Sequence, residues 1–408
     1  MTGQRSEPGP AGGWLTGGVA GVGLTSFFSD AGHEIATAVF PSFLTSVLHA
    51  SPGALGIIEG ASDALLGLSK IAGGPLADEP RRRARLASGG YVVTAIATSA
   101  IGLAATVWQA GLLRAVAWAA RGARGPARDA LLASLVPPRA YGRAFGLERA
   151  GDNLGAVAGP LIASALVGLV GVRGAIYWAL PPGLLAAVAI TIVARKARRI
   201  HADPIARRTV RLNLSGLRQT GIIRELLPVA LFEIGNTATT LLILRATQLL
   251  QEDTTSLTSA TSLAILLYAG HNAFAAIGSA VGGHWIDRAG PRVVLAAAAA
   301  AYAAAYGLFA MSGLTWPVLL LAFALAGTGI GLAEPAESTL VATLLPDHLR
   351  GSGFGVLGVV QAAGDFAAST AVALLWTAIS PAVAFSYAAA WMLAALLVGS
   401  LSRPAPRT

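Results

Sequence analysis

The chain repeats itself at a fixed separation of 209 residues, the distance from Asp78 to Asp287. The segment GGPLADEPRRR, which starts at Gly73, returns as GGHWIDRAGPR, which starts at Gly282. The same offset aligns further pairs without a gap: Gly122 with Gly331, Pro126 with Pro335, Leu131 with Leu340, Pro137 with Pro346, Gly142 with Gly351, Phe145 with Phe354 and Gly155 with Gly364. A period of this length indicates a duplicated unit of about two hundred residues. Two similar halves that face one another suit alternating access to a site between them.

Both copies are strongly apolar. Of 408 residues, 54% are hydrophobic and 12% charged, with a mean hydropathy of +0.65, whereas soluble domains carry about 25% charged residues. Such a chain lacks the polar surface that water requires and needs lipid as its solvent. It contains no cysteine, which excludes disulfides, thiolate catalysis and cysteine-based metal sites.

We predict an all-α integral membrane protein of twelve transmembrane helices, arranged as two pseudo-symmetric six-helix bundles, because irregular backbone cannot face lipid. The apolar runs long enough to span are 17–46, 52–77, 87–108, 111–136, 140–170, 174–195, 225–250, 257–285, 293–313, 316–345, 351–378 and 381–402. The predicted parts are an N-terminal tail (1–13), a first bundle (14–195), a basic linker (196–224), a second bundle (225–402) and a C-terminal tail (403–408).

The net charge of +9 lies in short loops and in the linker. This pattern sets membrane orientation, and no basic face with interleaved aromatics points to nucleic acid. The positive-inside rule places both termini and the linker in the cytoplasm, with the chain in the inner membrane. The N-terminus lacks the layout of a cleavable signal, so the first helix is expected to remain as an anchor. The linker either sets topology alone or also contacts anionic lipid.

The repeated loop carries a recognisable pattern. Its first copy resembles the signature loop of the major facilitator superfamily, G-x-L-a-D-r-x-G-r-k, although Arg81 stands where the family has Gly. The matching residues in the two copies are Gly74, Leu76, Ala77, Asp78, Arg82 and Arg83, then Gly283, Asp287, Arg288, Gly290 and Arg292. The resemblance covers the whole chain and implies a twelve-helix transporter that works by alternating access.

The two loops are predicted to form a cytoplasmic latch. Gly permits close helix approach, and Asp accepts backbone N–H groups or pairs with Arg across the halves. The expected partners are Asp129, near Arg128, for Arg82 or Arg83, and Glu337 for Arg292. The alternative is that these pairs only stabilise loops and do not break during transport.

Three ionisable residues, Asp30, His33 and Glu34, lie near the middle of the first predicted helix. Asp30 and Glu34 are one turn apart and share a face, and a charge at this depth costs about 3 kcal/mol unless it faces a cavity or a partner. The family resemblance places the first, fourth, seventh and tenth helices around a central cavity. We therefore predict proton coupling here; the alternative is a static salt bridge to the fourth helix.

The fourth predicted helix carries Arg114, Arg121 and Arg128, which are seven residues apart and form one stripe. The run from Arg121 to Gly125 resembles the family pattern R-x-x-q-G, with Arg124 in the q position. The stripe either neutralises Asp30, Glu34, Glu59 or Asp63, or captures an anionic substrate group.

The second half offers further candidates for a substrate cavity: Glu233, Asn236, Arg245, His271 and Glu334. His271 serves either as a proton relay or as a hydrogen bonder between helices. No pair of histidines has zinc-binding spacing, so we predict neither a metal site nor a cofactor.

Gly155, Gly159 and Pro160 resemble the g-x-x-x-G-P-x-x-G-G signature of the family's proton-driven exporters, with Ala163 and Ser164 in place of the last glycines. Small residues at this spacing allow tight packing and Pro160 is expected to kink the helix; generic close packing is the alternative. The sequence thus predicts a monomeric, non-enzymatic transporter that exports a small organic solute in exchange for protons. Proton-coupled or facilitated import of an organic anion or sugar is the main alternative, and a membrane sensor is a weaker one.

Overall fold

The structure is a computed structural model that describes residues 13–200, 214–253 and 257–401. Within these ranges every regular element is a helix, which confirms the all-α prediction for this part of the chain. The predicted C-terminal tail (403–408), nearly all of the N-terminal tail (1–13) and the middle of the basic linker (196–224) lie outside the described residues.

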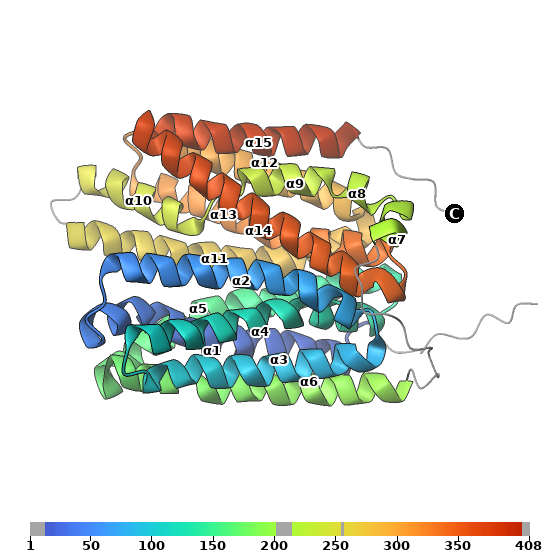
Figure 1. The fold of residues 1–408 in the computed structure, drawn as a ribbon. Helices are drawn as coiled ribbons and strands as arrows, with labels where there is room; N and C mark the ends of the chain where they lie inside the picture. Colours follow the sequence, from blue (N-terminus) through green and yellow to red (C-terminus); the bar gives the residue numbers. More distant parts are fainter. Residues whose placement is uncertain (1–12, 201–213, 254–256, 402–408) are drawn as a thin grey trace, which may run out of the picture.

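The first half contains six long helices (Figure 1). They are α1 (Gly17–Ser42), α2 (Pro52–Ala77), α3 (Pro80–Ala100), α4 (Val107–Ser134), α5 (Tyr141–Tyr177) and α6 (Leu180–Ile200). Short turns of other helix types extend three of the connections, at η1 (Phe43–Val47), η2 (Ile101–Leu103) and η3 (Pro138–Ala140).

The second half begins with three short helices, α7, α8 and α9, and the helices that follow are longer. The bounds are α7 (Leu214–Gln219), α8 (Ile222–Glu225), α9 (Leu227–Gly235), α10 (Thr239–Asp253), α11 (Leu257–Ala289), α12 (Pro291–Ala310), α13 (Trp316–Leu344), α14 (Asp347–Ala378) and α15 (Pro381–Leu401).

Nine helical stretches in the described part of the chain are long and apolar enough to cross a membrane. Helices α1, α2 and α4 have 26, 26 and 28 residues and stand outside that set. Charged side chains within these three helices, such as Asp30, Glu59 and Arg121, lower their hydropathy. The count of twelve transmembrane helices therefore stays a prediction.

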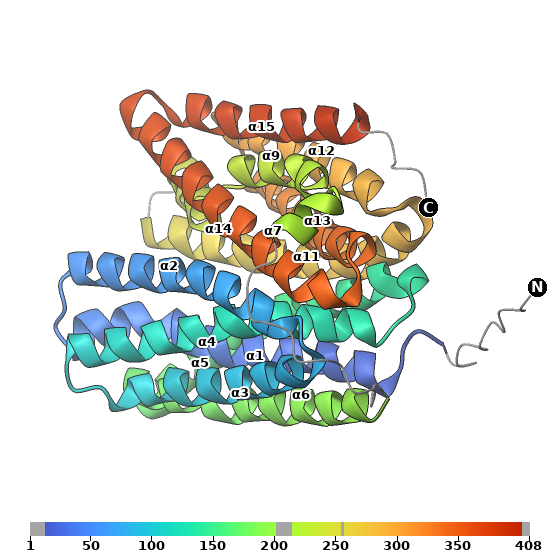
Figure 2. The same cartoon turned by 45° about the vertical axis from the view of Figure 1, so that its right-hand side comes forward.

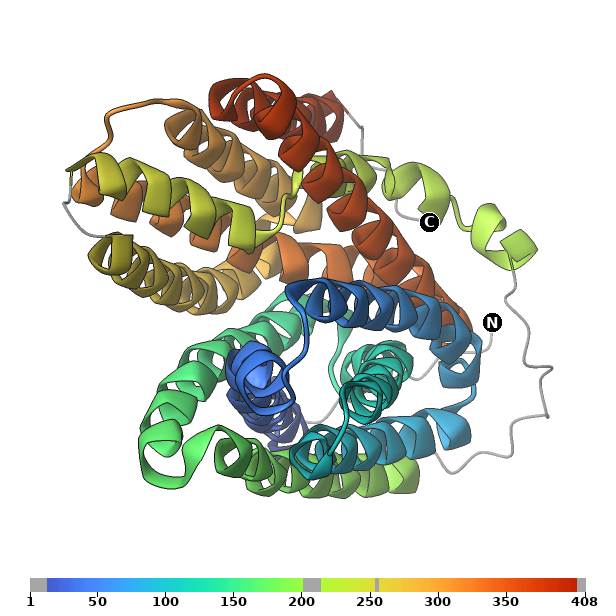
Figure 3. The same ribbon diagram turned by 60° about the vertical axis from the view of Figure 1, so that its left-hand side comes forward.

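The helix contacts recur in both halves. Helix α1 packs on α5 and α6 as α9 packs on α14 and α15, while α4 lies between α2 and α3 as α13 lies between α11 and α12. Between the halves, α2 packs on α14 and α5 packs on α11 (Figures 2 and 3). Each of these contacts has its counterpart at the 209-residue offset. That the two bundles superpose remains a prediction.

Paired glycines set the close approach within each half. A Cβ atom on Gly122 would lie 2.3 Å from the backbone oxygen of Leu66, and one on Gly331 would lie 2.2 Å from that of Ala275. These two pairs are related by the sequence repeat. No larger residue fits either position without moving the helices apart.

The predicted helix 225–250 is wrong as one continuous element. Helix α9 ends at Gly235 and α10 begins at Thr239. In the break, the backbone N–H of Thr237 donates to the Tyr306 hydroxyl at 3.1 Å, and that of Ala238 donates to Ser369 Oγ at 2.9 Å. These side-chain acceptors replace the helical ones, which a break at membrane depth requires.

Several other helix ends differ from the predicted runs; α5, for example, continues to Tyr177 rather than ending at 170, and α6 begins at Leu180 rather than 174. Helix α3 starts at Pro80, seven residues before the predicted run, because proline suits the first position of a helix. Helix α6 continues to Ile200, beyond the predicted start of the linker. The non-helical backbone inside α5 lies at Gly171, with φ of 74°, and not at Pro160.

Candidate functional site

An ion pair joins α1 and α4 near the middle of both helices. The Arg121 guanidinium donates a hydrogen bond to the Asp30 carboxylate, which is almost fully buried. Arg121 Nη1 is also buried and has no partner. Because a buried donor without an acceptor is costly, the guanidinium retains capacity for one more acceptor.

The other two arginines of the predicted stripe are also paired. Arg114 donates to Glu59 Oε2 from Nη2 at 2.6 Å, and its guanidinium lies over the ring of Trp118 at 3.9 Å. Arg128 contacts Asp129 at 2.8 Å and Glu148 at 2.7 Å. The stripe thus neutralises acids in this state, which agrees with the first of the two alternatives.

Arg124 faces the interior of the first half. Its Nη2 donates to Ser29 Oγ at 2.7 Å, and its guanidinium stacks 3.6 Å from the centre of the Tyr91 ring. A small cavity lies here between α1, α3, α4 and α6, and Gly32, His33 and Arg124 are among the residues that line it. Arg124 therefore lies away from the space between the halves, where a substrate-cavity residue was expected.

Two neighbours of Asp30 complete the first-half cluster. The Glu34 carboxylate is partly exposed and lies 3.8 Å from His33 Nε2. The His33 ring packs against Trp118 with the ring centres 4.4 Å apart, and its Nδ1 is buried without a partner. The structure thus brings the three predicted proton-coupling residues together with Arg121.

The glycines of α5 lie directly against this cluster. A Cβ atom on Gly155 would be 2.9 Å from the Cβ of Asp30, and one on Gly159 would be 2.4 Å from the Cβ of Glu34. The predicted Gly-Pro signature is therefore the surface against which α1 holds its two acids. The same two glycines thus pack α5 against α1 and lie beside the acids of the candidate site.

A second network crosses from the first half to the second. Arg149 on α5 lies 3.7 Å from Glu334 on α13 and 3.8 Å from Asp152. It also lies 3.4 Å from Glu148, whose side chain is fully buried and accepts a 2.6 Å hydrogen bond from Ser26. Glu334, a predicted cavity residue, is thus an ion-pair partner between the halves.

Acidic side chains gather at the break between α9 and α10. Asn236 Nδ2 donates to Glu233 Oε2 at 3.1 Å and to Asp365 Oδ1 at 3.2 Å. Gln361 Nε2 donates to Glu337 Oε2 at 2.8 Å. The cluster draws on α9, α13 and α14, and among the described residues no salt bridge joins it to a cation.

Two other predicted cavity residues make structural contacts instead. Arg245 donates to the backbone oxygens of Phe309 and Met311 at 3.0 and 2.8 Å, where α12 ends. His271 Nδ1 lies 3.3 Å from the backbone oxygen of Phe323 and is almost fully buried. For His271 this geometry agrees with the alternative of a hydrogen bonder between helices.

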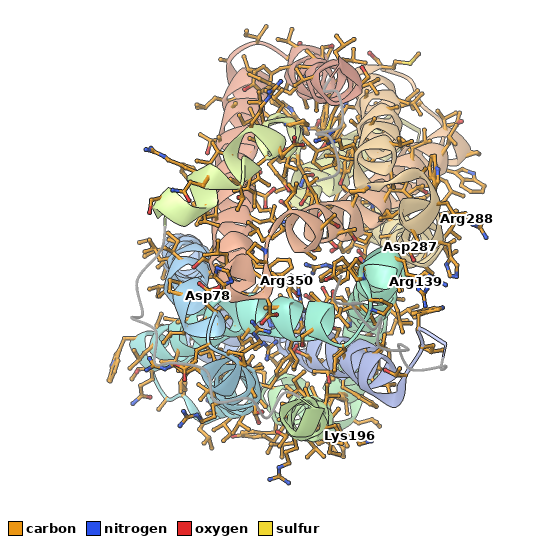
Figure 4. All side chains as sticks on the ribbon, turned by 90° about the vertical axis from the view of Figure 1, so that its right-hand side faces the viewer. Asp78, Arg139, Lys196, Asp287, Arg288 and Arg350 are labelled. Atoms are coloured by element: carbon orange, nitrogen blue, oxygen red, sulfur yellow. The ribbon has the colours of Figure 1, made fainter. Side chains whose placement is uncertain are left out.

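The signature-loop acids join the two halves at one end of the molecule (Figure 4). We call it the basic end, because Arg139, Lys196, Arg288 and Arg350 lie there. Asp78 accepts hydrogen bonds from the backbone N–H and the hydroxyl of Ser352. Asp287 accepts from the backbone N–H groups of Gly142 and Arg143 and from the Arg143 side chain. Burial raises the pKa of the Asp78 carboxyl, because losing water disfavours its charged form.

These acids seal the interface together with close glycine contacts. A Cβ atom on Gly74 would lie 2.9 Å from the Gly351 backbone oxygen, and one on Gly283 would lie 2.5 Å from that of Gly142. The two contacts are again related by the repeat. Helices α2 and α14, and likewise α5 and α11, therefore touch through backbone at the basic end.

The predicted partners of the latch arginines are wrong. Arg83 pairs with Asp347 at 3.0 Å, and Arg82 pairs with Glu79 within its own loop. Asp129 instead holds its neighbour Arg128, and Glu337 lies with Gln361 in the acidic cluster. Arg292 pairs with Glu225, and Arg288 is exposed at the basic end. Arg83 does reach α4, where it donates to the Ala130 backbone oxygen at 3.4 Å, while the neighbouring Asp129 carboxylate is bound by Arg128.

Comparison with known sequences gives the family. A sequence model described as the Major Facilitator Superfamily matches residues 22–251 and 226–408, which together cover most of the chain. The chain belongs to the Major Facilitator Superfamily. It is therefore a multi-pass membrane protein.

Two relatives within reach of sequence comparison lack an assigned substrate. The uncharacterized protein Rv2265 of Mycobacterium tuberculosis is 31% identical over 150 residues, which is 36% of each chain, so the match spans about a third of that relative's length. An MFS-type transporter of Methanocaldococcus jannaschii, MJ1317, is 25% identical over 368 residues and 90% of each chain.

Solved structures share the superfamily fold at low identity. The human organic anion transporter MFSD10 superposes with a TM-score of 0.72 at 16% identity, over 93% of this chain and 98% of its own. FucP in the outward conformation gives 0.70 at 16% identity, over 95% and 99%. These likenesses establish the fold alone.

Sequence reasoning missed three features of this superfamily member. Lys70 crosses to the second half, where a Cβ atom on Gly358 would lie 2.3 Å from its Cδ. Arg149 pairs between the halves, although its position inside an apolar run was visible. The α9–α10 break has a weak signal in the string Gly235-Asn236-Thr237, since Gly and Asn disfavour helix interiors.

Proposed function

We propose that this superfamily transporter exports a small organic molecule in exchange for protons, with Asp30, Glu34 and Arg121 as the coupling site. The observation that carries the proposal is the Asp30–Arg121 pair at mid-span, in which one guanidinium donor is buried without a partner. His33 and the α5 glycines position the two acids.

In this mechanism a proton and the substrate bind the Asp30–Arg121 pair in turn. The ionised Asp30 carboxylate and the buried, partnerless Nη1 of Arg121 together bind a polar group of the substrate by hydrogen bonds. Protonation of Asp30 removes its negative charge and releases the substrate. Loss of the proton restores the binding site, so that proton and substrate exclude each other as exchange requires.

We place the basic end in the cytoplasm and the protein in the inner membrane, as a monomer. The support is the positive-inside rule together with the gathering of Arg139, Lys196, Arg288 and Arg350 at this end (Figure 4). With the basic end closed by Asp78 and Asp287, the site then opens toward the outside. In alternating access, those two contacts break when the cytoplasmic side opens.

Import is the second candidate. A proton-coupled importer of a small organic anion or sugar would use the same pair with proton and substrate moving together. Two structures with a similar fold are an organic anion transporter and a fucose:proton symporter, and their activities support this second candidate. The α5 glycines, which resemble those of proton-driven exporters, favour export.

Transport in inverted membrane vesicles tests the proposal. A panel of labelled compounds is offered with an imposed pH gradient, interior acidic. We expect gradient-driven accumulation of at least one compound, and we expect Asp30→Asn to abolish accumulation while substrate counterflow persists. Glu79→Gln, which removes a partly exposed ion pair with Arg82, is the control. Normal pH-dependent transport by Asp30→Asn would refute the coupling role, and accumulation only in right-side-out vesicles would establish import.

A further inference from the structure

Glu233 occupies in the second half the place that Asp30 occupies in the first. Gly155 on α5 and Gly364 on α14 are equivalent under the 209-residue repeat. A Cβ atom on Gly155 would lie 2.9 Å from the Cβ of Asp30, and one on Gly364 would lie 2.3 Å from the Cβ of Glu233. The equivalence is hidden in the sequence, because the broken seventh helix shifts the alignment of these two acids.

The surroundings of the two acids differ in charge. The first-half helix α4 presents cations at Arg121, Arg124 and Arg128. The repeat places Ile330, Ala333 and Glu337 at the equivalent positions of α13. Each cation of the first half is therefore replaced by an apolar residue or by an acid. An acid beside Glu233 cannot be balanced in the way that Asp30 is balanced.

The carboxyl groups of the second half meet directly. Those of Glu233 and Glu337 are within hydrogen-bond reach of each other, as are those of Glu233 and Asp365. Glu337 is 1% exposed, and its Oε1 has no hydrogen donor, while Gln361 occupies its Oε2. Two ionised carboxylates are acceptors only, so this contact requires a shared proton.

The titratable groups around the pair come from several helices. Helix α13 also contributes Glu334, α12 contributes Tyr302 and Tyr306, and α14 contributes Asp365. The positive charge of Lys70, on α2 in the other half, attracts the Glu233 and Asp365 carboxyl groups, although no salt bridge to them is among the described contacts. Arg149 pairs with Glu334 and also attracts Glu337 electrostatically. From α15, no titratable side chain lies at Gly235 among the nearest atoms, which belong to Trp391, Met392 and the Ala388 backbone oxygen.

We propose that Glu233 and Glu337 bind a second proton, shared between their carboxyl groups, and that the exposed Asp365 exchanges it with the space between the halves. The inference rests on the proposed function, because it extends proton coupling from one half to both. The described residues contain no cluster of three ligands able to hold a metal ion, and the partnerless Glu337 oxygen calls for a hydrogen donor. Each half thus carries one proton, and one transport cycle moves two.

Proton release from the purified full-length protein tests this directly and needs no substrate. The protein, in weakly buffered detergent with a pH-indicator dye, is shifted from acidic to alkaline pH, and released protons are counted per molecule. Infrared difference spectra follow the carboxylic-acid C=O band in the same step. We expect Glu337→Gln and Glu233→Gln each to release one proton fewer than wild type and to lose a C=O band. Gln at position 337 supplies a donor to Glu233, so folding should persist.

Separate variants distinguish this inference from the function on which it rests. Asp30→Asn should release one proton fewer, and the Asp30→Asn/Glu337→Gln double variant two fewer, while Glu79→Gln matches wild type. If Glu337→Gln releases one proton fewer than wild type but Asp30→Asn releases as many as wild type, the first-half coupling site is refuted and the second-half site is supported. Wild-type release by both Glu337→Gln and Glu233→Gln would overturn the inference. Suppression of proton release by sodium chloride but not by choline chloride would also overturn the inference, since the site would then bind sodium.

Discussion

Arg350 donates a 2.6 Å hydrogen bond from Nη2 to the hydroxyl of Tyr141, and the two residues hold equivalent positions in the repeat, 209 residues apart. Equivalent residues of two related halves touch each other only near the axis that relates them. If the two bundles superpose as predicted, the axis between them passes through the interface at the basic end, with the Asp78 contact on one side and the Asp287 contact on the other (Figure 4). The predicted latch then has one acid on each side of this point.

Asp78→Ala should shift the protein away from the state that is closed at the basic end. The variant removes both hydrogen bonds to Ser352, and we expect a shift of about 1–3 kcal/mol, the usual range of coupling energies. Cross-linking between engineered cysteines on the ends of α2 and α14 measures the closed population in this naturally cysteine-free chain. Asp287→Ala should act similarly on α5 and α11. Unchanged cross-linking yields in both variants would count against a latch.

Gly159→Ala should weaken the packing of α1 on α5 at the coupling site. The added Cβ would lie 2.4 Å from the Cβ of Glu34, and overpacking of this kind costs about 1–3 kcal/mol. A lower Tm in detergent and a changed pH profile of transport are the expected results. Gly168→Ala is the matched control on the same helix, because a Cβ atom there meets nothing within 4 Å. Equal Tm values for the two variants would refute the tight contact.

Glu148→Gln should destabilise the fold more than any loss of an exposed ion pair. The Glu148 carboxylate is fully buried between Arg128 and Arg149, and its neutralisation leaves buried cations undercompensated, at a cost of about 3–5 kcal/mol. Thermal unfolding in detergent compares it with Glu79→Gln, whose pair with Arg82 is partly exposed and contributes about 0–1 kcal/mol. Similar Tm values for both variants would show that water reaches Glu148.

The superfamily and its all-helical fold could be predicted because they rest on patterns that survive in one sequence. Apolar length and the fixed offset of Asp78 and Asp287 require no knowledge of contacts. The grouping of Asp30, Glu34 and Arg121 followed from the cost of a charge in lipid, which leaves few places for each side chain to point.

The remaining features depend on helix rotation and on breaks. Arg83 pairs with Asp347 rather than with Asp129 because the ends of α2 and α14 meet between the halves. The residue pattern within a single helix does not indicate which helix of the other half it will contact. The α9–α10 break is stabilised by Tyr306 and Ser369, which lie far away in the sequence. Arg245 was expected to line a cavity, yet it donates to backbone oxygens at the end of α12. Either environment gives a buried guanidinium its acceptors, so the sequence alone does not distinguish them.

Substitutions at Arg121 separate geometry from charge at the coupling site. Arg121→Lys keeps the charge but loses the planar, two-pronged donor, so transport should weaken while the protein still reaches the membrane. Arg121→Ala leaves Asp30 buried without a cation and should abolish transport and lower abundance. Adding Asp30→Asn to Arg121→Ala removes the unpaired charge, so abundance should recover, but pumping should not. Transport and membrane abundance of the three variants are measured together. Normal activity in Arg121→Ala would show that this arginine neither binds substrate nor balances α1, and the competition mechanism would fail.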